Sequence, residues 1–127
     1  MFLGRSGPGV PARLEELRLL KDGWFEGGGS APASAGIDWL SDAFTRVYPE
    51  DLPLLYVYPT PEGDIRLEWA LGSHDVSLDI DLMQHRANLH ALNLSSDEDR
   101  EDELNLDEPS GWARLVEQIQ RLMGEAA

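Results

Sequence analysis

Acidic side chains at alternating positions have the clearest potential for chemistry in this chain. Asp79 and Asp81 lie two residues apart in a run of alternating polar and apolar residues, and Glu68 lies in a similar run before it. Residues two apart on a strand point to the same face, about 7 Å from one another. Carboxylates so placed, together with His90 from a later segment, can bind a divalent cation or share a proton. Small-ligand or divalent-metal binding by this polar face is therefore one hypothesis.

The simpler interpretation of the same residues is a solvated sheet face. An exposed antiparallel sheet face is normally polar, and Arg66 can neutralise part of the negative charge. No metal or other cofactor is therefore assigned.

A second acidic feature is the segment 95–108, where a single arginine, Arg100, stands among many carboxylates. Its acidic residues are Asp97, Glu98, Asp99, Glu101, Asp102, Glu103, Asp107 and Glu108. We predict a turn followed by a charged edge strand over residues 101–106. Asp97, Glu98 and Asp99 are candidates for electrostatic docking to a basic partner. They also suit a solvated hairpin end that keeps an edge strand from aggregating.

Signatures of several enzyme classes are missing from the sequence. The chain has no cysteine, so thiol nucleophiles, disulfides and cysteine zinc sites are excluded. It contains no G-x-S-x-G motif, and the acidic segment lacks the central glycine of a calcium-binding loop. Glycines 27–29 follow two aromatic residues and precede no Lys-Ser/Thr pair, which argues against a phosphate-binding loop. We therefore predict a protein that is not an enzyme.

The overall charge narrows the class of partner. The 127 residues carry a formal net charge of −14, which opposes binding to nucleic acid and to anionic membranes. A basic protein partner is compatible with that charge. The chain has no long apolar run, and its first residues lack the pattern of a secretory signal, so a cytoplasmic location is expected.

Periodic apolar residues indicate the elements that must position these side chains. Alternation predicts strands over residues 54–58, 65–71, 75–82, 86–94 and 101–106, and spacings of three and four predict helices over 12–21, 35–48 and 109–124. The predicted fold is an α+β two-layer sandwich of order α-α-β-β-β-β-β-α. It is an antiparallel five-strand meander covered on one face by helices. A disordered lead-in over residues 1–10 precedes a single domain over residues 11–124.

Four details of local structure follow from individual residues. Pro61 and Gly63 suit a type I turn with a G1 bulge between the first two strands. A change of parity among the leucines of the fourth strand predicts a bulge at residues 90–92. Ser34 is expected to cap the second helix. Trp24 and Phe25 are expected to fold under the domain.

Aromatic residues near the proline-rich turn offer a further contact surface. Tyr56, Tyr58 and Trp39 are expected to lie near that turn, where some of them can form a contact patch or belong to the core. These residues can form an interface only if their side chains are exposed.

Three groups of motifs resemble a small bacterial protein family of uncharacterised function. They are DGW, GGG and AP within residues 22–32, YPTPEG and EW within 58–69, and VSLDIDL at 76–82. The resemblance extends over residues 12–123 and implies one compact domain. It implies no activity, cofactor or catalytic residue.

Three functional hypotheses remain. The first is an acidic, non-enzymatic interaction protein that binds a basic protein, by analogy with bacterial antitoxins and immunity proteins. The second is the ligand- or metal-binding domain described above. The third is a structural module that dimerises through its sheet edges. The oligomeric state is left open.

Overall fold

The helices and strands follow the order that the sequence predicts. The computed structural model describes residues 9–48 and 55–126, and these contain three helices and five strands in the order α-α-β-β-β-β-β-α. The strands form one antiparallel sheet in which each pairs with its neighbours in the chain. The elements are α1 Gly9–Leu17, α2 Ser34–Val47, β1 Tyr56–Pro59, β2 Ile65–Leu71, β3 His74–Asp81, β4 Arg86–Asn93, β5 Asp99–Asn105 and α3 Pro109–Ala126.

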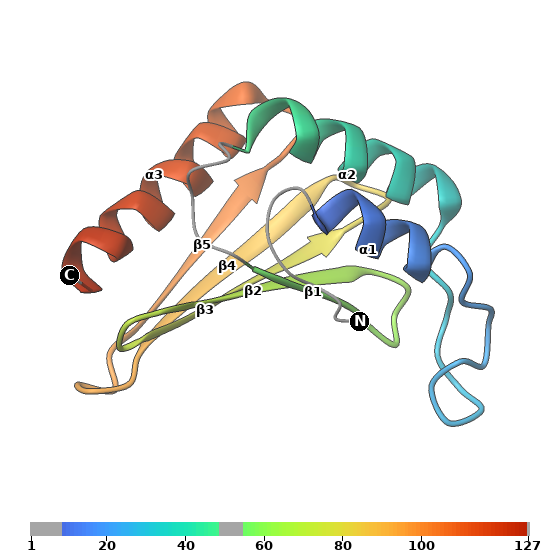
Figure 1. The fold of residues 1–127 in the computed structure, drawn as a ribbon, viewed down its shortest axis with the longest axis horizontal. Coiled ribbons are helices and arrows are strands. Elements are labelled where there is room, and N and C mark those ends of the chain that lie inside the picture. The colour runs from blue at the N-terminus through green and yellow to red at the C-terminus, as the bar shows by residue number, and fades with distance from the viewer. Residues whose placement is uncertain (1–8, 49–54, 127) are drawn as a thin grey trace.

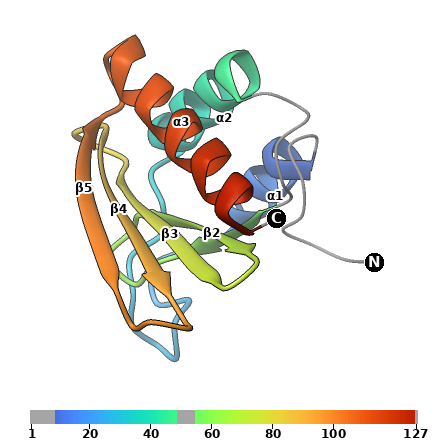
Figure 2. The same cartoon turned by 90° about the vertical axis from the view of Figure 1, so that its left-hand side faces the viewer.

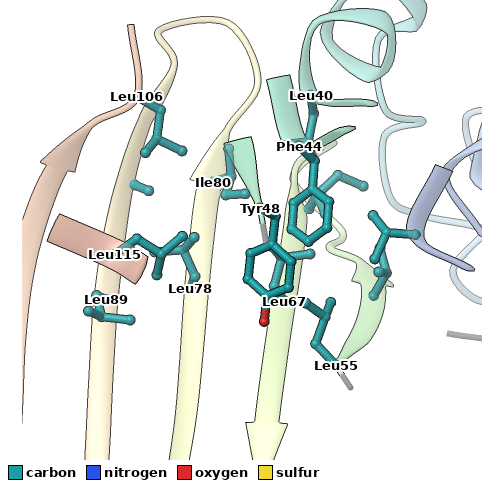
Figure 3. Packing of buried hydrophobic residues seen from close by; sticks show 14 of the residues in the cluster. Leu40, Phe44, Tyr48, Leu55, Leu67, Leu78, Ile80, Leu89, Leu106 and Leu115 are labelled. Atoms are coloured by element: carbon teal, nitrogen blue, oxygen red, sulfur yellow. The ribbon is translucent and has the colours of Figure 1, made fainter. Parts of the chain in front are cut away.

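The fold has two layers, because the described helices all lie on one side of the sheet (Figures 1 and 2). Strand alternation puts one set of side chains beneath them. Leu67, Leu78 and Leu89 are direct partners across β2, β3 and β4, and each is 4% exposed or less. Figure 3 shows these three leucines in the core. The predicted α+β sandwich is therefore confirmed.

Each helix contributes an apolar stripe to this core. Leu14 of α1, Phe44 of α2 and Leu115 of α3 are all 2% exposed or less. Full burial of a side chain of this size contributes about 1.5–3 kcal/mol. Packing against the sheet, rather than helix propensity, therefore provides most of the stability of these short helices.

The turn between β1 and β2 has the predicted geometry. Gly63 has φ +90° and donates its N–H to Thr60 O at 3.0 Å, while Thr60 N–H donates to Asp64 O at 2.9 Å. Closure by these two bonds with a left-handed glycine is the pattern of a type I turn with a G1 bulge. This turn sets the pairing of Tyr58 with Arg66 and thus the alignment of the sheet.

Boundaries of the first helix and first strand differ from the prediction. Helix α1 begins at Gly9 and ends at Leu17, so residues 9 and 10 are helical and residues 18–21 are not. Arg18 N–H still donates to Leu14 O, and from Leu19 onward the hydrogen bonds span three residues, as from Leu20 N–H to Leu17 O. Residues 1–8 of the predicted lead-in, and residue 54 of the predicted first strand, lie outside the described residues.

The predicted bulge in β4 is wrong. The pairing of β4 with β3 runs without interruption from Arg86 to Asn93. Leu92 pairs with Asp75 on the face opposite the helices, and Leu94 is 53% exposed beyond the strand. The change of parity needs no extra residue, because these two leucines simply stay outside the core.

The predicted cap at Ser34 is also wrong. The capping position is Ala33, which makes no side-chain capping bond, and Ser34 is the first helical residue. Its hydroxyl accepts a hydrogen bond from Arg18 Nη1 at 2.5 Å. Arg18 also pairs with Glu15 and Asp38, and these carboxylates hold its pKa above its usual value. Ser34 is therefore used to join α1 and α2.

The glycine-rich loop does not fold under the domain. Phe25 and Gly28 exchange two backbone hydrogen bonds of 2.8 Å, and Glu26 and Gly27 between them have φ +51° and +87°. Two consecutive positive φ angles are typical of a type I′ hairpin turn. The loop therefore pairs with itself and leaves Phe25 48% exposed, while Trp24 donates its indole N–H to Ser30 O at 2.8 Å.

Candidate interaction surface on the open sheet face

The face of the sheet opposite the helices, here called the open face, carries two rows of side chains that cross all five strands. Each row begins with a tyrosine on β1 and ends with a glutamate on β5, because the register of the four strand pairs is uninterrupted. The first row is Tyr58, Arg66, Asp79, Asn88 and Glu103. The second row is Tyr56, Glu68, Ser77, His90 and Glu101.

The open face is strongly acidic. Its strand positions hold seven carboxylates and two arginines, a formal excess of five negative charges with the histidine neutral. The carboxylates are Glu68, Asp75, Asp79, Asp81, Asp99, Glu101 and Glu103, and the arginines are Arg66 and Arg86. All of these side chains are at least partly exposed. A surface with such an excess of one sign attracts oppositely charged groups over distances of about 8–10 Å at moderate salt.

Arg66 binds two of the four carboxylate and histidine residues predicted as a ligand site. Its Nε and Nη2 donate to the two oxygens of Asp79 at 2.7 and 3.1 Å, and its Nη1 lies 3.6 Å from Glu68 Oε2. The bond to Asp79 is the main cause of a raised pKa for Arg66. The cation that lies between Glu68 and Asp79 is therefore the guanidinium of Arg66, at the place where the prediction put a ligand.

The other two predicted residues are on the same face but have different surroundings. Asp81 Oδ1 accepts the N–H groups of Met83 and Gln84, both at 2.9 Å, and so stabilises the β3–β4 turn. His90 Nε2 lies 3.8 Å from Asp99 Oδ2. Within residues 9–48 and 55–126, no three His, Asp or Glu side chains are grouped closely enough to hold a metal ion.

Asp97, Glu98 and Asp99 lie at the β4–β5 turn and are all exposed. The turn is closed by backbone bonds of 2.8 Å from Asp97 N to Asn93 O and from Asn93 N to Glu98 O. Strand β5 then begins at Asp99, two residues earlier than predicted. The acidic turn projects from one end of the sheet, at the lower left of Figure 1, and extends the negative charge of the open face.

Two tyrosines form an aromatic wall along one side of the open face. Tyr56 and Tyr58 are 49% and 41% exposed, and their ring centroids are 6.4 Å apart. They border a hollow of about 330 Å³ whose lining includes Glu68, Ser77 and Leu92. The sequence placed aromatic residues here, but their position beside Arg66 and Glu68 depends on the strand register.

Trp39 is not part of this wall, which corrects the predicted aromatic set. It belongs to α2 on the helical side of the sheet and stacks on His85, with ring centroids 3.7 Å apart and planes at 2°. His85 Nδ1 lies 2.6 Å from Asp107 Oδ1. The three side chains join α2 to the β3–β4 turn and to the segment before α3. This cluster connects elements and borders none of the hollows of the open face.

A second hollow of about 360 Å³ lies at the end of the open face where β2 begins, and sequence reasoning missed its key residue. Asp64 lines it with Glu62, Asp79 and Asp81. Burial raises the pKa of Asp64, the N–H of Leu82 at 3.1 Å partly offsets that effect, and the neighbouring carboxylates raise the pKa further. The signal available in the sequence was the acidic residue directly after the Pro-Glu-Gly turn.

Comparisons with family models, with curated proteins and with solved structures gave no match to this chain. The resemblance to a bacterial family therefore stays a prediction. Among the described residues, no helix combines the length and the hydropathy needed to cross a membrane.

Proposed function

We propose that this chain is a non-enzymatic interaction protein that binds a basic protein through the open face, by analogy with antitoxins and immunity proteins. The observation that carries the proposal is the excess of carboxylates on a sheet face that no described helix covers. The proposal includes a cytoplasmic location for this chain.

Charge complementarity supports this partner over the alternatives. The net charge of −14 repels nucleic acid, anionic lipid and a second copy of the chain alike. Against a basic surface the same charge accelerates encounter and disfavours wrong partners, because opposite potentials attract before contact is made. Homodimerisation through the sheet edges is therefore the weaker hypothesis.

The geometry also favours a protein surface over a small ion. Arg66 occupies the space between Glu68 and Asp79, and Asp81 is used within a turn. The remaining carboxylates of the open face lie apart from these, with Asp75 toward the start of β3 and Asp99, Glu101 and Glu103 along β5. Dispersed charge of this kind matches several cationic side chains at once, whereas a metal ion needs its ligands at one point.

The test is capture from the source organism with the tagged chain and two charge variants. E101Q/E103Q removes two exposed carboxylates from the open face. E26Q/E117Q removes two exposed carboxylates elsewhere, so both variants have the same net charge. We expect a stoichiometric basic partner that elutes with salt and binds E101Q/E103Q more weakly than E26Q/E117Q. Equal loss in both variants, or no salt-sensitive partner, would contradict the proposal.

A further inference from the structure

The tyrosine wall gives the open face a chemical preference that charge alone does not provide. Tyr56 and Tyr58 are neighbours on the same face of β1, with planes 22° apart, and about half of each side chain is exposed. Both border the hollow of about 330 Å³, together with Glu68, Asp75 and Leu92. The lining also includes Arg66, His90 and Ala70, so aromatic ring surface and carboxylate oxygens lie there beside apolar side chains and beside a guanidinium that already contacts Glu68.

Among the basic side chains, arginine matches this combination best. Its planar guanidinium stacks on aromatic rings while its edge donates several hydrogen bonds to carboxylates, whereas the ammonium of lysine is a compact and strongly hydrated charge. The chain itself gives an example on the same surface, since Arg66 makes a bidentate contact with Asp79 beside Tyr58.

Distances define how such a guest can lie. A planar group between two rings needs about 3.5 Å on each side. The centroid separation of 6.4 Å leaves too little room for that arrangement. A bound guanidinium must therefore stack on the side of one ring that faces the hollow. Its N–H donors then point along the hollow to Glu68 or Asp75.

The edge of β1 restricts how the partner segment approaches. Arg13 of α1 donates from Nε to Val57 O at 3.1 Å, so a backbone acceptor of this edge strand is already bound. A segment that extended the sheet beyond β1 would have to displace this bond. The open face, in contrast, is crossed by no described element.

We propose that the hollow beside Tyr56 and Tyr58 binds an arginine side chain on an extended segment of the basic partner, which lies across the open face. This inference rests on the proposed function and adds a preference for arginine over lysine. The wall determines that preference, and the surrounding carboxylates provide the salt-dependent attraction.

The experiment measures binding of fluorescent nona-arginine and nona-lysine to the full chain by anisotropy at low salt. We expect wild type to bind nona-arginine at least about threefold more tightly than nona-lysine, because each exposed cation–π contact is weak. Y56L/Y58L should lose that ratio and keep its affinity for nona-lysine. Y56F/Y58F should retain the ratio, since the rings remain, and F25L removes an exposed ring elsewhere as a matched control.

The outcomes separate the two proposals. Equal binding of both peptides by wild type, or an unchanged ratio in Y56L/Y58L, overturns the arginine site and leaves the proposed function standing. Failure of wild type to bind either peptide at low salt overturns both. Circular dichroism and thermal melting verify that each variant is folded, and the single variants Y56L and Y58L, each expected to lower the ratio, replace Y56L/Y58L if the double variant does not fold.

Discussion

The two faces of the sheet differ in what their side chains contribute. On the covered face, Leu67 and Leu78 have no exposed surface, and each such residue contributes about 1.5–3 kcal/mol to stability. On the open face, the best ion pair joins Arg66 and Asp79, both more than 40% exposed, and exposed pairs of this kind contribute about 0–1 kcal/mol. The covered face therefore sets stability, and the open face is available for binding.

Adjacent residues of β3 allow the sharpest test of that difference. Leu78→Ala should lower the free energy of unfolding by about 2–5 kcal/mol, since it leaves a cavity beneath the helices. Ser77→Ala changes the neighbouring residue on the open face and should alter the free energy of unfolding by about 0.5 kcal/mol or less. Urea unfolding measures both. Similar losses in the two variants would show that the open face is also part of the stabilising structure.

Gly111 lies where α3 packs tightly against the end of β5. A Cβ atom at this position would lie 2.0 Å from the backbone oxygen of Asn105. Gly111→Ala should therefore force α3 to shift and destabilise the fold by about 1–3 kcal/mol or more.

Gly124 provides the matched control in the same helix, because a Cβ there meets nothing within 4 Å. Gly124→Ala should be neutral or stabilising by up to about 1 kcal/mol. Thermal melts compare the two variants. A tolerated alanine at position 111 would mean that the seam between α3 and β5 is looser than its geometry indicates.

A buried polar pair tests whether the covered face depends on packing alone. Trp69 donates its indole N–H to Tyr48 Oη at 2.9 Å within the core. Tyr48→Phe keeps the ring but leaves the indole without this acceptor, and the cost should be about 1–3 kcal/mol. Tyr58→Phe on the open face should change stability by about 0.5 kcal/mol or less.

The pH dependence of the same variant gives a second measurement. Burial raises the pKa of Tyr48 to about 12. In the unfolded chain the value is about 10. Because the folded value is higher, this contribution is complete below pH about 10 and is lost as the pH rises toward 12. Denaturation at alkaline pH should show that loss in wild type and a smaller one in Tyr48→Phe.

Alternation along single strands was sufficient to predict the faces of the sheet. It placed Glu68, Asp79, Asp81 and His90 on one side, as the register confirms. Alternation fixes the face of a residue but says nothing of its cross-strand partner. The two rows on the open face depend on the turn lengths that align neighbouring strands.

Two errors in the sequence-based prediction share a physical cause, which is contact between segments distant in the chain. Serine is a residue type that often caps helices, but the hydroxyl of Ser34 accepts a hydrogen bond from Arg18 instead. Trp39 was grouped with the tyrosines, but α2 places it on the helical side of the sheet, where it stacks on His85. Glu26 has a positive φ although it is not Gly, Asn or Asp, so the sequence lacked the usual residue pair of a type I′ turn. A glycine at position 111, within the pattern of the last helix, was a sequence sign that this helix packs closely against another backbone.

Asp64 at the rim of the open face carries the smallest expected effect and tests where the two faces meet. Burial is the main cause of its raised pKa, so the protonated form is favoured by folding. The stabilisation is complete below the unfolded value of about 3.9 and is lost as the pH rises through the higher folded value. At neutral pH the ionised carboxylate therefore weakens the fold. Asp64→Asn keeps an oxygen for the N–H of Leu82 and should stabilise by about 0.5 kcal/mol at neutral pH.

That gain should vanish in melts at about pH 3, where Asp64 of the wild type is protonated as well. Asp75→Asn removes one exposed charge from the same face and controls for net charge. If both variants gain equally at neutral pH, general repulsion on the open face explains the effect. If only Asp64→Asn gains, the desolvation that defines the covered face extends to the rim, and the boundary between stabilising and binding surface lies at this residue.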